Sequence, residues 1–278
     1  MTIFVFTVLI FLIATSAGLV GSLTGLGGGV VIIPLLTLVF KVDIHYAIGT
    51  SLISVIATSS GAAAAYVKEG ITNIRLGMFL ELATTIGAII GAFIATYVAP
   101  SSIAIVFGVI LVFSAITSFT KKEEPVYRED PSSFGHRLKL DNSFPDKGEK
   151  VHYGVKNVAG GFAMMNIAGI LSGLLGIGSG ALKVIAMDRV MKIPFKVSTT
   201  TSNFMIGVTA AASAGIYMKR GYIDPGLSMP VVIGVLAGAF IGSKILFRAE
   251  TKTLKIFFAF VILFLAAEMI YNGITHQL

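Results

Sequence analysis

The hydrophobic positions of the chain fall into ten apolar segments that alternate with shorter polar ones. A first set occupies residues 3–23, 27–40, 46–67, 74–99 and 102–119, and a second set occupies residues 157–175, 181–190, 197–218, 226–247 and 254–273. Several segments reach about twenty residues, which is enough for a helix to cross about 30 Å of hydrocarbon. The short alternating segments typical of a β-barrel are absent. The pattern therefore predicts an all-α integral membrane protein.

The two sets are copies of one unit. Residues 25–29 (GLGGG) return 151 positions later as residues 176–180 (GIGSG). Two hydrophobic halves that are broken by glycines at the same place are typical of secondary transporters, which bind their substrate between the repeats. We predict two membrane repeats, 1–119 and 156–278, joined by a polar linker, 120–155.

The linker 120–155 differs in composition from the rest of the chain. It holds half of all the acidic residues together with seven lysines and arginines, and it is interrupted by prolines and glycines. Such a composition disfavours regular structure and favours a solvated, partly disordered connection. A regulatory surface is the alternative interpretation.

The topology follows from the distribution of basic residues. Each glycine cluster and its two flanking segments span about 35 residues, too many for one helix and few for two full crossings. Either each pair is one kinked span, which gives eight crossings and parallel repeats, or each pair is a hairpin that enters and leaves on the same side. The hairpin topology places sixteen lysines and arginines on one side and three on the other, whereas the kinked topology divides them twelve to seven.

Cytoplasmic loops collect lysine and arginine, so the hairpin topology is the better one. We predict two inverted repeats, each with a glycine-broken re-entrant helical hairpin and three transmembrane helices. The linker is then cytoplasmic, both termini lie outside, and the protein is a multi-pass protein of the plasma (inner) membrane.

Composition narrows the function further. Apolar residues make up 55% of the chain, charged residues make up 13%, and the net charge is +7. In a membrane protein this positive charge indicates cytoplasmic loops, so we expect no nucleic-acid partner. The chain has no cysteine, and its four histidines are scattered. We therefore expect neither a metal site nor a cofactor.

The motifs of enzymes and ATP-driven pumps are absent or out of context. Residues 176–181 fit G-x-G-x-x-A, but no strand precedes them and no acidic residue follows at the spacing of a dinucleotide site. The chain contains no G-x-x-x-x-G-K-[ST] motif and no Ser/His/Asp set at membrane depth. We expect a protein that is not an enzyme and has no ATP motor of its own.

The glycine clusters form the predicted substrate site. Irregular backbone at membrane depth is tolerated only where protein or a water-filled cavity covers it. The second half-helix of each hairpin begins at a cluster, so its unpaired N–H groups and positive dipole end face the protein centre. The residues that we expect to contact a small anion here are Gly27, Gly28, Gly29, Gly178, Ser179 and Gly180.

Two charged residues lie inside apolar segments. Lys183 follows the second glycine cluster, where the first repeat has Ile32. Glu81 lies about two turns into an apolar helix, where the second repeat has Val232. A charge at membrane depth usually faces a cavity or a partner. We expect Lys183 either to bind the anion, to pair with Glu81 or to snorkel, and Glu81 either to form an ion pair or to carry a coupling proton. If Lys183 binds the anion, Lys183→Ala weakens anion binding more than it weakens folding.

Polar and small residues recur at matched positions as well. Ser51 and Ser202 correspond between the repeats and, with Asn203, could hydrogen-bond substrate oxygens, or could instead join helices. The G-x-x-x-G pairs at 87–91 and 238–242 are close-packing faces, which act either within one subunit or along the seam of a homodimer.

The duplicated GLGGG and GIGSG clusters are each followed, about twenty residues later, by GTSL (49–52) or TTSN (200–203). This combination resembles the TauE/SafE sulfite exporter family over essentially the whole chain outside the linker. The resemblance implies export of sulfite or organosulfonates across the plasma membrane, driven by an ion gradient. Ser179, where the first repeat has Gly28, is a departure between the two clusters.

The sequence therefore predicts a secondary transporter of small sulfur oxyanions that works by alternating access, with protons as a candidate coupling ion. A passive anion channel that uses the same positive helix ends is one alternative. A membrane scaffold or membrane-embedded enzyme is another, although no paired carboxylates or metal ligands converge in the apolar segments.

Overall fold

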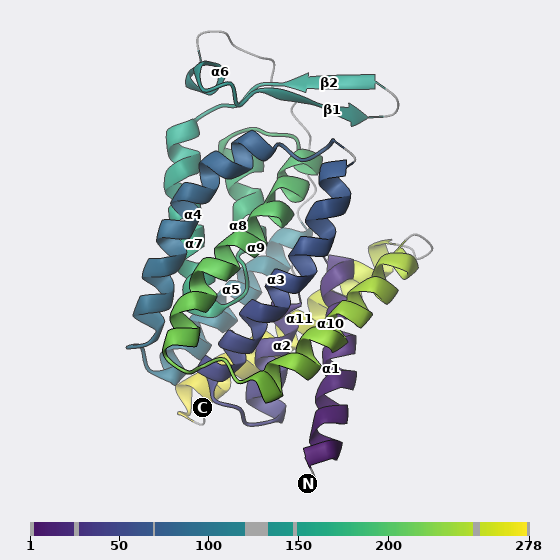
Figure 1. The fold of residues 1–278 in the computed structure, drawn as a ribbon, viewed down its shortest axis with the longest axis vertical. Coiled ribbons are helices and arrows are strands. Elements are labelled where there is room, and N and C mark those ends of the chain that lie inside the picture. The colour runs from purple at the N-terminus through teal and green to yellow at the C-terminus, as the bar shows by residue number, and fades with distance from the viewer. Residues whose placement is uncertain are drawn as a thin grey trace.

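The computed structural model describes residues 3–24, 28–68, 70–119, 133–146, 149–246 and 251–276, and most of these residues are helical. The first repeat contains α1 (Ile3–Thr24), α2 (Gly29–Pro34), the π-helical segment η1 (Leu35–Val39), α3 (Ile44–Lys68), α4 (Ile74–Ala95) and α5 (Pro100–Phe119) (Figure 1). The second contains α7 (Val158–Leu175), α8 (Gly180–Ile185), the π-helical segment η2 (Ala186–Val190), α9 (Phe195–Lys219), α10 (Pro225–Leu246) and α11 (Thr251–Ile274). Between them lie α6 (Phe134–Arg137), β1 (Asn142–Asp146) and β2 (Glu149–Tyr153).

The helices reproduce the duplication that the sequence predicts. α2, η1, α3 and α4 each begin and end 151 residues before α8, η2, α9 and α10. The turns match too, because Lys41 has a φ of +54° and Lys192 has a φ of +58°. The same local sequence pattern therefore folds into the same element in both halves.

The chain doubles back after each glycine cluster. The ring of Phe6, near the start of α1, lies 5.5 Å from the ring of Phe40, which follows η1. In the second repeat the N–H of Lys156 donates a 3.0 Å hydrogen bond to the carbonyl of Met191, so the residue before α7 meets the residue after η2. Each repeat therefore begins with a helical hairpin whose two ends lie together.

The two hairpins start at opposite ends of the molecule. Figure 1 shows both termini at one end and the β-hairpin at the other; α1 begins beside the terminal end, whereas α7 begins beside the β-hairpin. The clusters at the tips of the hairpins consequently approach each other from opposite directions in the interior.

Glycines hold each hairpin against a helix of the other repeat. α7 packs along α4, and α1 packs along α10. A Cβ on Gly87 or Gly91 would collide with the backbone of Asn166 or Ile170 in α7, and a Cβ on Gly238 would collide with the carbonyl of Thr15 in α1. At these three positions the close-packing faces act within one chain, which is the first of the two interpretations given above.

The surface of the helices is suited to a bilayer. Large apolar side chains such as Phe4, Met78, Leu82, Phe93 and Phe240 are exposed. Among the described residues, α4 and α7 are long and apolar enough to cross a membrane, and five shorter apolar helices accompany them.

The expectation that the linker has little regular structure is wrong for much of its length. β1 and β2 form an antiparallel hairpin in which Phe144 lies opposite Val151 and Asn142 lies opposite Tyr153. The alternation of buried and exposed side chains in these short strands explains their formation, because Phe144 and Tyr153 are buried against the helices. Composition averages over such a pattern and does not reveal it. Residues 120–132 lie outside the described part of the chain.

Candidate functional site

The two hairpin tips meet in the interior of the protein. A Cβ on Gly29 would lie 3.2 Å from the carbonyl oxygen of Gly176 and would collide with the hydroxyl of Ser51. Gly176 and Gly178 have φ values of +67° and +70°, which glycine adopts without strain. Gly27 lies outside the described residues. Glycine is therefore required here both for close approach and for the turn itself.

The two matched serines contact the second tip. Ser51, from α3, donates a 2.8 Å hydrogen bond to the carbonyl of Gly176. Ser202, from α9, donates a 3.2 Å hydrogen bond to the carbonyl of Gly180. Both hydroxyl protons are directed to backbone carbonyls, so a substrate would meet these hydroxyls through their remaining lone pairs or after the bonds exchange.

Ser179 is the least satisfied polar residue of the tips. It precedes α8 with a φ of +46°, and its side chain does not cap the helix. It is 3% exposed, and its Oγ has no hydrogen-bond partner within the part of the chain that the structure describes. Gly28, its equivalent, has a right-handed helical conformation. The two tips are therefore not identical, and only the second presents a buried, unpaired hydroxyl.

A cavity adjoins this hydroxyl. A small cavity of about 20 Å³, enough for about one water molecule, lies between α5 and the second tip and is lined by Ile110 and Phe113 on one side, by Ile177, Ser179 and Ala181 on the other, and by Val30 of the first hairpin. Its walls are mostly apolar, and the polar side chains that line it are Ser179 of the second tip and Ser114 of α5. Small-molecule sites commonly have this character, with apolar walls and few polar groups.

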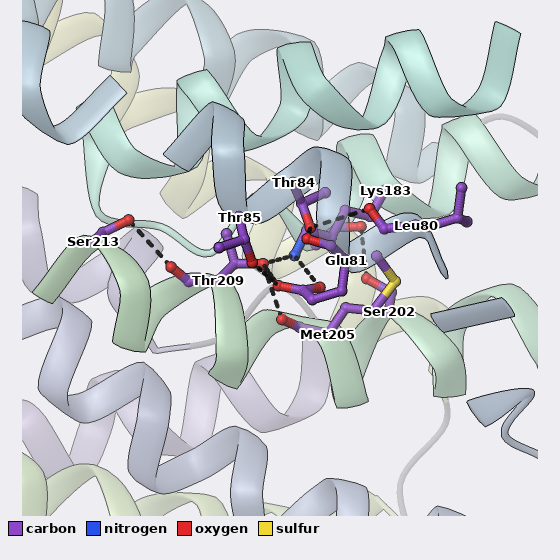
Figure 2. Close-up of polar contacts among 10 residues, drawn as sticks. Leu80, Glu81, Thr84, Thr85, Lys183, Ser202, Met205, Thr209 and Ser213 are labelled. Carbon is purple, nitrogen blue, oxygen red and sulfur yellow. Dashed lines mark hydrogen bonds and ion pairs between the residues drawn. The ribbon is translucent and has the colours of Figure 1, made fainter. Parts of the chain in front are cut away.

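Lys183 and Glu81 form a buried pair across the two repeats, as Figure 2 shows. Lys183 is fully buried and donates a hydrogen bond to the hydroxyl of Thr209. Its Nζ lies 3.9 Å from Oε2 of Glu81. Thr209 in turn donates a 2.6 Å hydrogen bond to Oε1 of Glu81. Thr209 therefore bridges the ammonium and the carboxylate.

The carboxylate is only partly satisfied. Thr85 donates a second, 3.2 Å hydrogen bond to Oε1, whereas Oε2 has no hydrogen-bond partner among the described residues. The single hydroxyl proton of Thr209 has a second acceptor in the carbonyl of Met205, 3.0 Å away. Oε2 of Glu81 is therefore available to a proton or to another hydrogen-bond donor.

This pair has no counterpart at the repeat-related positions. The positions equivalent to Glu81, Lys183 and Thr209 are occupied by Val232, Ile32 and Thr58. The pair joins α4 to α8 and α9, which already pack together. It therefore distinguishes the second hairpin chemically from the first.

Two residues show where sequence reasoning falls short. Asn203 is half-buried and makes no hydrogen bond within the described residues, so the structure does not bring it to the tips as it brings Ser51 and Ser202. Thr209 was not a candidate. A usable signal was its spacing, because Ser202, Thr209 and Ser213 follow one face of α9 at i, i+7 and i+11.

The chain matches a transporter family and several probable membrane transporter proteins over nearly its whole length. The family model described as sulfite exporter TauE/SafE covers residues 10–269. The probable membrane transporter protein YunE of Bacillus subtilis is 31% identical, with 96% of this chain and 98% of the relative covered. YdhB of the same organism is 28% identical, with 85% and 89% covered.

A probable membrane transporter protein of Methanocaldococcus jannaschii is 24% identical, with 89% of each chain covered. No solved structure gives a significant match. The helical fold, its duplicated glycine tips and these similarities lead to one conclusion: the chain belongs to the TauE/SafE family of membrane transporters.

Proposed function

We propose that this membrane transporter exports small sulfur oxyanions, such as sulfite or organosulfonates, by alternating access, and that the substrate binds at the second hairpin tip. The observation that carries the proposal is the buried, unpaired hydroxyl of Ser179 at the cavity beside the start of α8. An unsatisfied buried polar group is unfavourable unless a ligand or water satisfies it. The description of the family supports sulfite as the first substrate to test.

The charge at this tip favours an anion. The backbone N–H of Lys183 donates to the carbonyl of Ser179, so the lysine lies one helical turn after the serine. Its ammonium points toward Glu81 in this structure, and the pair is nearly neutral as a unit. Proton uptake at Oε2 of Glu81 would leave the positive charge of Lys183 uncompensated and would favour an anion nearby. Glu81 is on this proposal the site of a coupling proton.

The arrangement of the hairpins supports a re-entrant, inverted-repeat topology. The paired ends at Phe6 and Phe40 and at Lys156 and Met191 fit hairpins that enter and leave on the same side. Together with the bias of basic residues, this favours a cytoplasmic linker with both termini outside the plasma membrane.

The packing also suggests which parts move. α4 packs with α7 and α9, and α10 packs with α1 and α3. We propose that each moving body combines one hairpin with the helix of the other repeat that packs along it, α10 with the first hairpin and α4 with the second, in place of a motion of repeat one against repeat two. The contacts between the bodies then include the tips themselves, where Gly29 lies close to the carbonyl oxygen of Gly176.

Ser179→Gly tests the site without breaking a contact. Glycine tolerates the positive φ of this position and stands at the equivalent position in repeat one. Removal of one hydrogen bond to a charged ligand is expected to raise the Kd for sulfite about tenfold or more. Isothermal titration in detergent measures the affinity, and an unchanged Kd in the folded variant would remove Ser179 from the site.

A further inference from the structure

The β-hairpin of the linker is docked onto the helices. Leu140, Phe144, Tyr153 and Val155 are buried in one apolar cluster that also includes residues of α4, η2 and α9. The outward face of the hairpin is polar: Ser143 and His152 lie opposite each other, and His152 is exposed. A two-stranded hairpin has little stability on its own. Its order therefore depends on this docking. We call residues 134–146 and 149–155 the lid.

A buried polar contact fixes the lid to the body. Asn73 is 1% exposed, and its side-chain amide donates to the carbonyl of Leu140 at 2.8 Å and to the hydroxyl of Tyr153 at 2.9 Å. Burial raises the pKa of the Tyr153 phenol above its ordinary value, so the hydroxyl stays neutral at physiological pH. The contacts of Asn73 with the lid are therefore neutral hydrogen bonds that add to the apolar packing.

The same asparagine connects the lid to the neighbourhood of the second tip. Its backbone N–H donates to the hydroxyl of Thr201 at 3.1 Å. The next residue is Ser202, whose hydroxyl bonds Gly180 at the tip. Asp224, the equivalent of Asn73 in the second repeat, caps its own helix at Leu227. The linker occurs once, so the other hairpin receives no second copy of the lid.

One apolar cluster extends from the lid to the neighbours of the buried ion pair. The cluster beneath the lid includes Leu80, which precedes Glu81, and Met205, whose carbonyl accepts the hydroxyl of Thr209. With the lid docked, water would have to cross this cluster to reach the pair from the linker end. Separation of the lid would expose one side of the cluster.

We propose that the lid must separate from Asn73 before the linker-side end of the second hairpin can open, so that lid docking limits transport. This proposal rests on the transport function proposed above. The chain has no cysteine, which makes engineered thiols unambiguous probes of the motion.

Cross-linking gives the first arm of the test. Lys196 Nζ donates to the carbonyl of Pro145 at 3.4 Å, and both residues are exposed. A short reducible bismaleimide between Pro145→Cys and Lys196→Cys should lower the initial rate of sulfite movement in proteoliposomes at least tenfold, with recovery on reduction. The matched control joins Ser143→Cys to His152→Cys, which closes the β-hairpin on itself and leaves the lid free. If the fully cross-linked protein transports at the rate of the unlinked protein, the proposal that lid docking limits transport is contradicted.

The second arm needs no transported anion. Val197→Cys places a nearly isosteric thiol in the buried cluster beside Lys196. Adding Tyr153→Phe removes one acceptor of Asn73 and should raise the rate of modification by a water-soluble maleimide about tenfold. Adding Tyr217→Phe instead removes a buried tyrosine hydroxyl that contacts Gly173, away from the lid, and should leave the rate unchanged.

The two arms separate the two proposals. If the thiol of Val197→Cys is labelled at equal rates with and without Tyr153→Phe, the proposal that the lid separates from Asn73 is contradicted, whatever the transport results. If the unlinked double-cysteine protein moves no anion while the labelling arm responds as expected, the transport function fails and the lid remains a mobile cover of the second hairpin.

Discussion

Lys183→Met is expected to lower the free energy of unfolding by about 3–5 kcal/mol. Lys183 is fully buried, and the side chain of Glu81 is 9% exposed, so water hardly replaces the lost partner. The variant leaves a buried carboxylate without its compensating charge. Glu81→Gln leaves a buried ammonium unpaired and should be destabilising by a similar amount. Unfolding in a mixed-detergent titration, followed by circular dichroism, measures both.

The double variant Lys183→Met/Glu81→Gln separates stability from transport. It removes both charges, keeps an amide for Thr209 and Thr85 to bond, and should recover most of the lost stability. If Lys183 supplies the charge that the anion needs, the folded double variant should still lose about 10- to 100-fold in transport rate, which corresponds to one charge-assisted hydrogen bond. A stable double variant with a normal rate would make the pair purely structural.

The second large effect is expected at a helix contact. Gly91→Ala should lower the free energy of unfolding by about 3 kcal/mol, because the added Cβ meets the backbone of Ile170 from α7 and neither helix can yield locally. Gly215→Ala is the matched control. Gly215 also lies inside a helix, α9, but a Cβ there meets nothing within 4 Å.

Gly215→Ala should be neutral or stabilising by up to about 1 kcal/mol, since alanine is the better helix former. The difference between the two alanine variants isolates close packing from helix propensity. The same unfolding titration compares them. Equal unfolding midpoints for the two variants would contradict the close contact of α4 with α7. They would also contradict the proposal that each moving body combines helices of both repeats.

The duplicated elements were predictable from the sequence because their causes are local. The two glycine clusters interrupt the apolar segments at positions 151 residues apart, and each cluster ends one helix and starts another. The boundaries of α3 and α9 consequently follow the same pattern of residues in both copies. The partners of the close-packing glycines were not predictable. Gly87 and Gly91 identify a face for contact, but α7 becomes their partner only through the tertiary arrangement.

Part of the site was also predictable, because several of its residues stand out when the two repeats are compared. Matched serines and an unmatched lysine and glutamate are visible in a repeat alignment, and the structure brings Lys183 within 3.9 Å of Glu81. Thr209 gives a weaker signal, because a threonine in a membrane helix commonly bonds the carbonyl one turn earlier, as this one does with Met205. Its second role, as the bridge between two charges, depends on which helices are neighbours.

Flux measured in proteoliposomes tests whether the protein couples anion transport to a proton. Sulfite, or a small sulfonate, is followed with and without an imposed pH gradient. We predict saturable movement that accumulates the anion against its own gradient when the pH is stepped, and loss of that accumulation in Glu81→Gln. Saturable movement without accumulation would contradict proton coupling and favour a uniporter, a channel or another coupling ion. No movement of either anion would contradict the sulfur-oxyanion function itself.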